Sequence, residues 1–498
     1  MRHPGPPGRF PLLGDARAAP FLSDGGMAPS SHRPTRPSRP ARAATALAIA
    51  AVTALLAACS ASPADPAASA PAVEPVVLPG SPVGQQAQWL LDTVNAEDAV
   101  PVQETGERLA QVMLDAASAE DIAGVLEQVR AGRPWTATAH EEQGPQAVTT
   151  ITSADAGSFD MQVAIDDAGL ITGLFFGEPE GDREPATSWA ELEEQAAALG
   201  GDVSLTVTRV ADGDLGERIL EVLPDGVRST DARPIGSIVK LYVLGALVQA
   251  VEEGRIGWDD PLTVTDDVRS LPSGELQDAP TGTVVSVRDT AEKMIAISDN
   301  TATDMLIQAV GRERVEAALA DLGHSDPPRN VPLMTTRDLF RIGWQDDGAL
   351  RDAWADGDAA ERRALLDALP GGAIDVPVSA VTDVVWTDGA DWFATPDDIA
   401  RAHARLAELA ATPAGEPVRG ILAANPGLPD PERFDHVAFK GGSSVGTLAL
   451  SYLVEDGDDA WTVVVQAAAR EAGDLERQSA YSGLAADAAT LLADGARG

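Results

Sequence analysis

The sequence predicts an α+β protein with two folded units that differ in the order of their elements. In the first unit, three helical patterns precede four alternating runs, as expected for helices packed on a curved antiparallel sheet. The second unit mixes helices with strands and ends in a hairpin, which predicts an antiparallel sheet flanked by helices. Turn-rich pieces separate the runs, and the chain shows no internal repeat.

The first unit is expected between residues 85 and 187. Its helical patterns cover 86–95, 107–117 and 118–130, and its alternating runs cover 135–140, 148–152, 159–165 and 171–176. Ser118 and Asp121 have the spacing of a helix N-cap pair. This order of elements resembles the small cone-shaped fold of nuclear transport factor two and the steroid isomerases. We find no catalytic constellation in it, and we interpret His140 and Asp160 as ordinary strand or turn residues.

The segment before this unit has the pattern of an export signal. We expect Met27 to be the better start, and four arginines then precede the apolar run 43–58. That run is short for a bilayer-spanning helix of about 20 residues. It ends at Leu56-Ala-Ala-Cys59, which resembles the lipobox of bacterial lipoproteins, where the cysteine is lipidated. We therefore expect a leader and signal over 1–58 and an Ala/Pro/Ser-rich tether over 59–84.

Composition excludes several classes of function. The net charge is −41, so nucleic acid and anionic membrane surfaces repel the chain. Cys59 is the single cysteine, which rules out internal disulfides and Cys-based metal sites. The six histidines lack metal-ligand spacing, and we expect no metal and no cofactor.

The second unit, expected over 188–498, is organised around Ser237 and Lys240. A helix (189–199), a strand (203–209) and an irregular segment up to Asp231 precede them. Three residues separate the serine from the lysine, so both side chains lie on one face of the helix that they open. The apolar run 241–248 predicts that this helix is buried, which lowers the pKa of the Lys240 amine. A hydroxyl beside such a base is an activated nucleophile.

Lysine usage strengthens this interpretation. The chain has 36 basic residues, yet only Lys240, Lys293 and Lys440 are lysines. An arginine cannot release its proton in a protein, so a proton-shuttling site cannot use it in place of lysine. A Ser-x-x-Lys motif alone remains compatible with a surface serine and a lysine whose stem lies along the protein.

Two further motifs carry polar groups. Ser298-Asp-Asn300 interrupts two helical patterns, 286–297 and 301–310, and is expected on the connecting loop. Lys440-Gly-Gly-Ser443 is expected on a strand of the C-terminal hairpin sheet, beside the runs 448–454 and 461–467. Gly441 and Gly442 allow a substrate to approach the backbone closely.

The three motifs, in this order and on these elements, resemble those of the penicillin-recognising serine enzymes, the class A β-lactamases and penicillin-binding proteins. The resemblance implies a β-lactamase-like domain that includes an all-helical subdomain. Together with the cone-shaped unit and the lipoprotein tether, it resembles a two-domain subfamily that includes a protein of clavulanate-type biosynthesis.

The resemblance also implies roles for individual residues. Ser237 attacks the carbonyl, Lys240 takes its proton, and Ser298 relays a proton to the leaving nitrogen. Asn300, Gly441 and Gly442 contact the substrate, and Lys440 attracts its carboxylate. The backbone N–H groups of Ser237 and Ser443 form the oxyanion hole.

The chain departs from the family pattern at two places. Gly441 stands where the family has Thr or Ser, which removes one hydroxyl contact. Class A enzymes also carry a glutamate beyond the second motif that activates the deacylating water. Here that region reads Asn330-Val-Pro-Leu-Met-Thr-Thr, and an acid from the stretch 345–391 is the remaining substitute. Without such a base, the acyl-enzyme persists.

The competing interpretation of the third motif is a nucleophile elbow. Residues 442–446 match Gly-x-Ser-x-Gly, but an alternating strand follows where that motif requires a helix. We therefore expect a lipid-anchored serine hydrolase on the outer face of the cytoplasmic membrane. We expect it to be a monomer that acts on small β-lactam, peptide or ester substrates. The alternatives to β-lactam hydrolysis are D,D-peptidase, penicillin-binding or esterase activity, or a non-catalytic binding lipoprotein.

Overall fold

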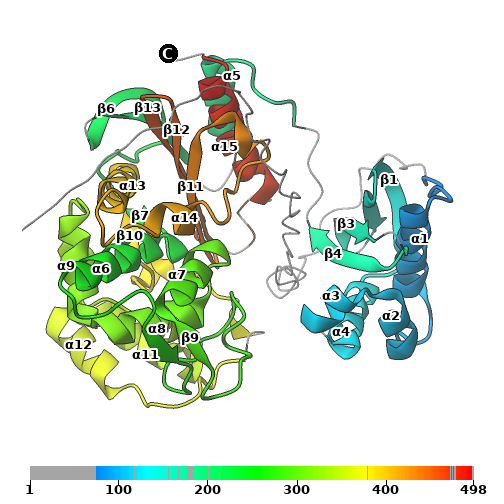
Figure 1. Ribbon diagram of the computed structural model, residues 1–498, viewed down its shortest axis with the longest axis horizontal. Coiled ribbons are helices and arrows are strands. Elements are labelled where there is room, and N and C mark those ends of the chain that lie inside the picture. The colour runs from blue at the N-terminus through cyan, green and yellow to red at the C-terminus, as the bar shows by residue number, and fades with distance from the viewer. Residues whose placement is uncertain are drawn as a thin grey trace, which may run out of the picture. The chain divides into compact units, whose positions relative to one another are not determined.

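The computed structural model describes residues 75–495, with gaps at 117, 155, 167, 178–182, 200–201, 212, 378–379, 472, 474 and 476–477. The expected leader, signal, Cys59 and most of the tether lie outside the described residues. Within them, no helix is both long and apolar enough to cross a membrane. The described elements form an N-terminal domain, α1 to β4, and a C-terminal domain, α5 to α15 (Figure 1).

The N-terminal domain places helices before a four-stranded antiparallel sheet, as the sequence predicts. Its helices are α1 (Pro82–Asn95), α2 (Val102–Arg108), α3 (Gln111–Ala116) and α4 (Ala119–Arg130). The strands pair in the order β1 (Thr136–Gln143), β2 (Gln146–Ser153), β3 (Gly157–Ile165) and β4 (Ile171–Gly177). Ser118 caps α4 in a reciprocal pair with Asp121, which confirms the predicted helix start.

One predicted helix of this domain is wrong. The pattern 107–117 is split into α2 and α3 because the chain between them pairs with β4. Leu109 forms a parallel bridge with Ile171, and the Ala110 N–H donates to the Ile171 carbonyl at 2.8 Å. A hydrogen bond to a strand replaces the helical one, so a long-range contact overrides the local helical pattern.

The C-terminal domain is built on a five-stranded antiparallel sheet. The strand order is β11 (His436–Ser444), β12 (Thr447–Asp456), β13 (Asp459–Ala468), β5 (Ser204–Ala211) and β6 (Asp214–Val222). The segment up to Asp231 was expected to be irregular, and β6 corrects that prediction. Its residues alternate weakly between apolar and polar, but pairing with β5 supplies the hydrogen bonds that define the strand.

Helices cover both faces of this sheet. Apolar residues of α5 (Trp189–Ala198) and α15 (Gln478–Ala493) pack in one core cluster with one face, and Figure 1 shows these two helices side by side. Residues of α6 (Lys240–Glu252) and α13 (Pro396–Ala410) belong to the cluster on the other face. The residues of α6 from Lys240 to Val248 are fully buried, as the all-apolar pattern predicts.

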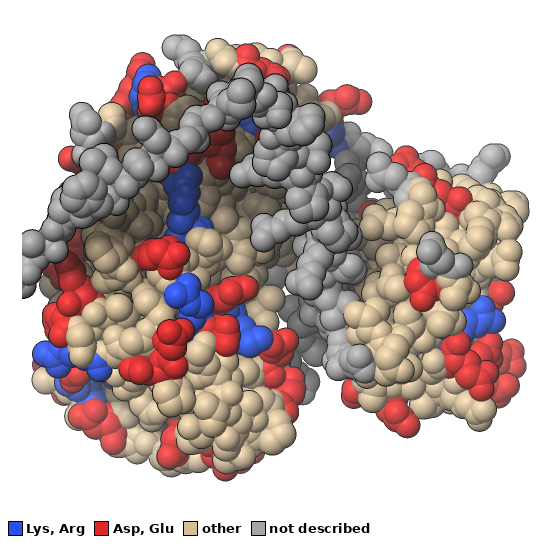
Figure 2. Space-filling model, in the orientation of Figure 1, with Lys and Arg blue, Asp and Glu red and all other residues tan. Residues whose placement is uncertain are grey.

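The remaining helices extend the second cluster into a helical region. They are α7 (Val287–Ala296), α8 (Asn300–Val310), α9 (Arg312–Asp321), α10 (Thr336–Trp344), α11 (Ala349–Asp356), α12 (Ala359–Ala368) and α14 (Val418–Leu422). Two short ribbons accompany them, β8 (Pro261–Thr263) with β9 (Val284–Ser286), and β7 (Arg233–Pro234) with β10 (Phe393–Ala394). Figure 2 shows acidic side chains scattered over the visible surface, in keeping with the net charge of −41.

Candidate active site

Ser237 lies in a 3₁₀ turn, η2 (Gly236–Val239), that leads directly into α6. The β7–β10 ribbon fixes the entry to this turn, because the Ile235 N–H donates to the Trp392 carbonyl at 2.9 Å. Residues on either side of Ser237 are buried, whereas Ser237 itself is half-buried. Its hydroxyl has no hydrogen-bond partner among the described residues. The side chain is therefore free to meet an incoming group.

Lys240 begins α6 and carries its amine into a buried polar centre. The amine donates to the Ser298 carbonyl at 2.6 Å, to the Ser298 hydroxyl at 3.0 Å and to the Asn300 side-chain oxygen at 2.8 Å. Burial lowers the pKa of Lys240 well below its usual value, and the nearby Lys440 lowers it further. The lowered pKa favours the uncharged amine, which can accept a proton.

Ser298 lies between α7 and α8 in a left-handed backbone conformation, with φ of +55°. A non-glycine residue adopts this region at a cost, and such positions gather at functional sites. Lys240 and Lys440 both donate to its hydroxyl, each at 3.0 Å. The two amines occupy the lone pairs of that oxygen, so its own proton can point to a third group.

Asn300 is the first residue of α8 rather than part of a loop, because Asp299 caps that helix. Its side-chain oxygen accepts from Lys240, and its amide nitrogen donates to the Leu271 carbonyl at 3.1 Å. Both ends of the amide therefore already bond to the protein. In this structure Asn300 orients Lys240.

Lys440 brings the second amine to Ser298 from β11. It is 2% exposed and also donates to the Gly441 carbonyl at 2.7 Å. Burial lowers the pKa of Lys440 to about 7. The amine is therefore partly charged at neutral pH, and a bound carboxylate would favour its charged form. Ser451 fixes the strand at this point by donating to the Lys440 carbonyl at 2.8 Å.

The turn that carries Ser237 packs directly against β11. A Cβ at Gly442 would lie 2.0 Å from the Ile235 carbonyl oxygen and 2.8 Å from the Ser237 nitrogen. A Cβ at Gly236 would lie 2.9 Å from the Ser443 nitrogen. Both glycines are required by this close approach, which brings the backbone nitrogens of Ser237 and Ser443 near each other. Gly441 is less constrained, since its nearest neighbour would be the Phe439 ring at 3.1 Å.

Three buried carboxylates surround this centre, and backbone N–H groups bind all of them. Asp299 accepts from the N–H groups of Glu275, Leu276 and Ala302. Asp304 accepts from the N–H groups of Thr336 and Arg337, and burial raises its pKa to about 7. Asp391 accepts from the N–H groups of Gly236 and Trp392 and from the Ser444 hydroxyl. In the described part of the chain, no carboxylate bonds to the Ser237 hydroxyl.

Sequence reasoning missed Asp304, Asp391 and His403. His403 is fully buried and bonds through Nε2 to the Ser451 hydroxyl at 2.9 Å, and burial lowers its pKa to about 3. Asp304 stands four residues after Asn300, on the same face of α8. That spacing was the available signal for it. Asp391 and His403 meet the site through contacts that no local pattern indicates.

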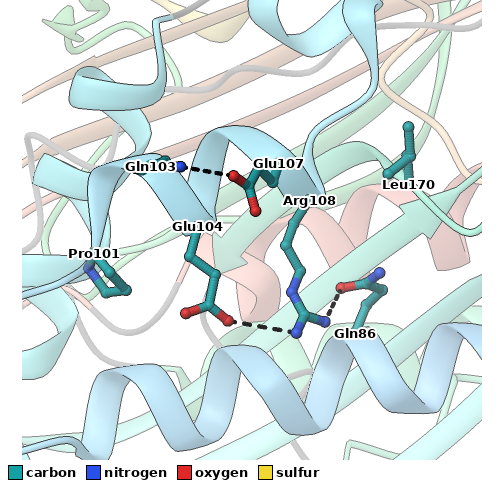
Figure 3. A pocket seen from close by; sticks show the side chains of 7 residues that line it. All are labelled: Gln86, Pro101, Gln103, Glu104, Glu107, Arg108 and Leu170. Atoms are coloured by element: carbon teal, nitrogen blue, oxygen red, sulfur yellow. Dashed lines mark hydrogen bonds and ion pairs between the residues drawn. The ribbon is translucent and has the colours of Figure 1, made fainter.

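Other parts of the molecule offer weaker sites. The N-terminal domain has a surface hollow of about 680 Å³ lined by seven residues, where Arg108 bonds to both Glu104 and Gln86 (Figure 3). Arg108, the one basic residue that lines this hollow, is therefore already paired. No group of three or more His, Cys, Asp or Glu residues able to hold a metal ion occurs within the described ranges.

Family comparisons agree with the order of the two domains. Residues 78–171 match the model described as "ORF 12 gene product N-terminal", and residues 190–425 match the "Beta-lactamase enzyme family". No curated protein matches the chain.

Several solved structures are similar to the chain at low identity. A β-lactamase from Sphaerobacter thermophilus is 21% identical, over 62% of this chain and 98% of that chain, with a TM-score of 0.43. A PBP-A variant, in an acyl-enzyme complex with penicillin G, is 16% identical over 63% and 100%, with a TM-score of 0.42. A β-lactamase from Chitinophaga pinensis is 18% identical over 62% and 98%, with a TM-score of 0.40.

The family match begins within α5 and spans the segments that carry Ser237, Lys240 and Ser298, while Lys440 follows it on β11. The match and the two-amine centre around Ser298 are independent observations on the same domain. Residues 190–425, which include Ser237, Lys240 and Ser298, match the β-lactamase enzyme family, and this match supports a serine hydrolase of the β-lactamase-like type.

Proposed function

We propose that Ser237 is the nucleophile of an acyl-enzyme reaction that opens β-lactam rings. The observation that carries this proposal is the convergence of the buried amines of Lys240 and Lys440 on the Ser298 hydroxyl. Lys240 lies one turn of helix after Ser237. The amine of Lys240 stands on the same helical face as Ser237 and has a lowered pKa. This is the arrangement of an activated serine.

Ser237, Lys240 and Ser298 together account for every proton transferred in the reaction. The Ser237 oxygen bonds to the lactam carbonyl carbon while its proton passes to Lys240. The N–H groups of Ser237 and Ser443 stabilise the oxyanion. When the carbon–nitrogen bond breaks, the Ser298 hydroxyl gives its proton to the ring nitrogen and recovers one from Lys240. The product is a Ser237 ester, and water later releases it as the ring-opened acid.

Substrate recognition rests mainly on Lys440. Its amine lies beside Ser298 and attracts a carboxylate, which β-lactams carry. The Gly441 substitution leaves this contact without the hydroxyl found in the family. We therefore propose anionic acyl substrates that lysine holds by charge, with fewer hydrogen bonds than in related enzymes.

Deacylation is proposed to be slow. Asp299, Asp304 and Asp391 are each bound by backbone N–H groups, so their oxygens are occupied and none bonds to Ser237. This observation favours the second candidate, a penicillin-binding or D,D-peptidase type of reaction in which the acyl-enzyme persists. Ester hydrolysis by the same serine is compatible with both.

Reaction with a fluorescent penicillin tests the nucleophile. We expect wild-type protein to be labelled and Ser237→Ala to stay unlabelled. A label that persists supports the penicillin-binding reaction, and rapid release supports efficient β-lactam hydrolysis. If neither the label nor the hydrolysis of a small ester depends on Ser237, the domain is a non-catalytic binding protein and the proposal fails.

We further propose that Cys59 is lipidated and holds the protein on the outer face of the cytoplasmic membrane. The support is the order of basic, apolar and small residues before the only cysteine. Several acyl chains on one residue would anchor the chain stably. Labelling with a radioactive fatty acid should depend on Cys59, and Cys59→Ala should appear in the soluble fraction. Retention of Cys59→Ala in the membrane fraction would contradict the anchor.

The N-terminal domain is proposed to share the cone-shaped fold without a catalytic site of its own. Its helices precede a four-stranded antiparallel sheet, and apolar side chains such as Leu90, Met113 and Met161 fill its interior. His140 bonds to Thr149 and Glu142, and Asp160 to Thr150, which leaves both as ordinary strand residues. Soaking or titration with steroid-like ligands should therefore show no binding in this interior.

A further inference from the structure

Asp391 connects the two chain segments that would form the oxyanion hole. One of its oxygens accepts from the Gly236 N–H at 2.9 Å, directly before Ser237 in the chain. The other accepts from the Ser444 hydroxyl at 2.9 Å, directly after Ser443. A single carboxylate thus bonds to the neighbour of each residue that supplies an N–H group. No short-range pattern links these residues, since Asp391 is 155 positions from Gly236.

The surroundings of Asp391 make this connection rigid. The side chain is 3% exposed and sits at the start of the short ribbon that β10 forms with β7. It also accepts from the Trp392 N–H at 2.7 Å, and the Trp392 carbonyl in turn accepts from Ile235 at 2.9 Å. The carboxylate is therefore fixed from its own backbone and from the entry of η2.

The same contacts exclude Asp391 as the missing water-activating base. It ends the acid-rich stretch 345–391, one of whose acids could replace the family's glutamate according to the sequence. Its two oxygens already accept three hydrogen bonds, and it has no contact with the Ser237 hydroxyl. Burial raises the pKa of Asp391 to about 6, against the opposing effect of Ser444. Burying a carboxylate costs free energy, so its presence here indicates that it positions the groups bonded to it.

We propose that Asp391 is a positioning residue that holds the N–H groups of Ser237 and Ser443 at the separation an oxyanion hole needs, an inference that rests on the proposed function. Without this bridge, η2 and β11 still touch through their glycines, but the carboxylate no longer fixes their relative shift along the strand. A displaced donor weakens the stabilisation of the transition state while leaving substrate binding intact.

Three variants separate the positional role from folding. Asp391→Ala removes the bridge and should lower the acylation rate by roughly tenfold to a hundredfold, less than the loss of an oxyanion donor itself. The apparent KM should stay unchanged. Asp391→Asn keeps an acceptor for the Gly236 N–H and should recover most of the rate. Ser444→Ala removes one half of the bridge and should give an intermediate loss.

The matched control is Asp398→Ala. Asp398 is also fully buried and accepts from the N–H groups of Ser325 and Thr395, but it lies at the start of α13. We expect this control to lose stability with an unchanged acylation rate per folded molecule. Equal losses of rate in the Asp398 and Asp391 variants would show a general folding effect and overturn the proposal.

The vibrational band of the acyl carbonyl in full-length protein reports the hole directly. Hydrogen bonds from both donors lower its frequency, so Asp391→Ala should shift the band upward or split it. Asp391→Asn and Asp398→Ala should leave it near the wild-type position. An unshifted band in Asp391→Ala and Ser444→Ala overturns the inference.

The backbone amide resonances of Ser237 and Ser443 in the unliganded protein test the inference without requiring acylation. If wild-type protein is not acylated, the proposed function fails, but these resonances still test the bridge. Both should move in Asp391→Ala and stay in place in Asp398→Ala. Unmoved resonances in Asp391→Ala overturn the positioning role whatever the reaction proves to be.

Discussion

Both domains have apolar cores, but only the C-terminal domain also buries amines among its described residues. The N-terminal domain buries an apolar cluster whose side chains pack against one another. It includes Leu90, Met113, Leu126, Ile151 and Met161. The centre of the C-terminal domain buries two amines and three carboxylates among hydrogen bonds. Burying charge costs free energy unless partners compensate, whereas burying apolar surface stabilises.

The difference teaches where chemistry can occur in this chain. Lys240 and Lys440 are 0% and 2% exposed, and burial depresses the pKa of each. An interior tuned to stability alone would replace both with apolar residues. The retained amines therefore mark the candidate reactive centre, whereas the described core of the N-terminal domain is mainly apolar.

Removing one amine should have the largest effect. Lys240→Met keeps the length of the side chain but removes the proton acceptor, so acylation should fall by roughly 10²–10⁴-fold. The rate of labelling by fluorescent penicillin, normalised to folded protein, measures it. Lys293→Met is the matched control, because Lys293 is paired with Glu275 at the surface. A Lys240→Met rate within tenfold of wild type would contradict the assigned base.

An apolar deletion in the N-terminal domain should cost stability without costing chemistry. Leu90 is fully buried in α1, and Leu90→Ala should lower the free energy of unfolding by about 2–5 kcal/mol. Faster hydrogen exchange across β1 to β4, with an unchanged acylation rate, is the expected pair of results. A large loss of acylation in this variant would mean that the first domain takes part in the reaction.

The pH dependence should distinguish charged from uncharged substrates. The pKa of Lys440 is lowered to about 7, so its charge is present below pH 7 and lost above it. The second-order rate of acylation by an anionic β-lactam should therefore fall as pH rises through 7. Because the two amines share Ser298, the apparent pKa belongs to the pair.

A neutral ester provides the comparison for that experiment. Its reaction needs the uncharged form of Lys240 and no carboxylate contact, so its rate should hold or rise over the same pH range. Identical profiles for the two substrates would remove Lys440 as the carboxylate-binding group.

The smallest expected effects come from helix caps, one in each domain. Ser118 caps α4 and Ser286 caps α7, and each accepts an N–H three residues on. Either serine changed to alanine should cost about 1 kcal/mol. Thermal unfolding should show Ser118→Ala affecting the N-terminal domain alone. Ser286→Ala should additionally slow acylation slightly, since Ser298 follows the end of α7 by two residues. No change in rate would show that the α7 end is held independently.

Much of the fold followed from local patterns, and the exceptions have a common cause. The alternating runs became β1 to β4, and the apolar run after Lys240 became the buried helix α6. The predicted helix over 107–117 was wrong because Leu109 pairs with Ile171. The strand β6 was missed because its pairing with β5, more than its own residues, defines it.

The amino-acid sequence by itself determined which residue types are available and how they repeat over a few positions. It placed Ser237 and Lys240 on one helical face and reserved lysine for three positions, because such relations depend on short spacing. Tertiary structure alone decided that both amines meet at Ser298, that the pKa of Lys440 also falls, and that Asp391 joins η2 to β11. These outcomes depend on packing between segments 58 to 155 residues apart, which local periodicity does not encode.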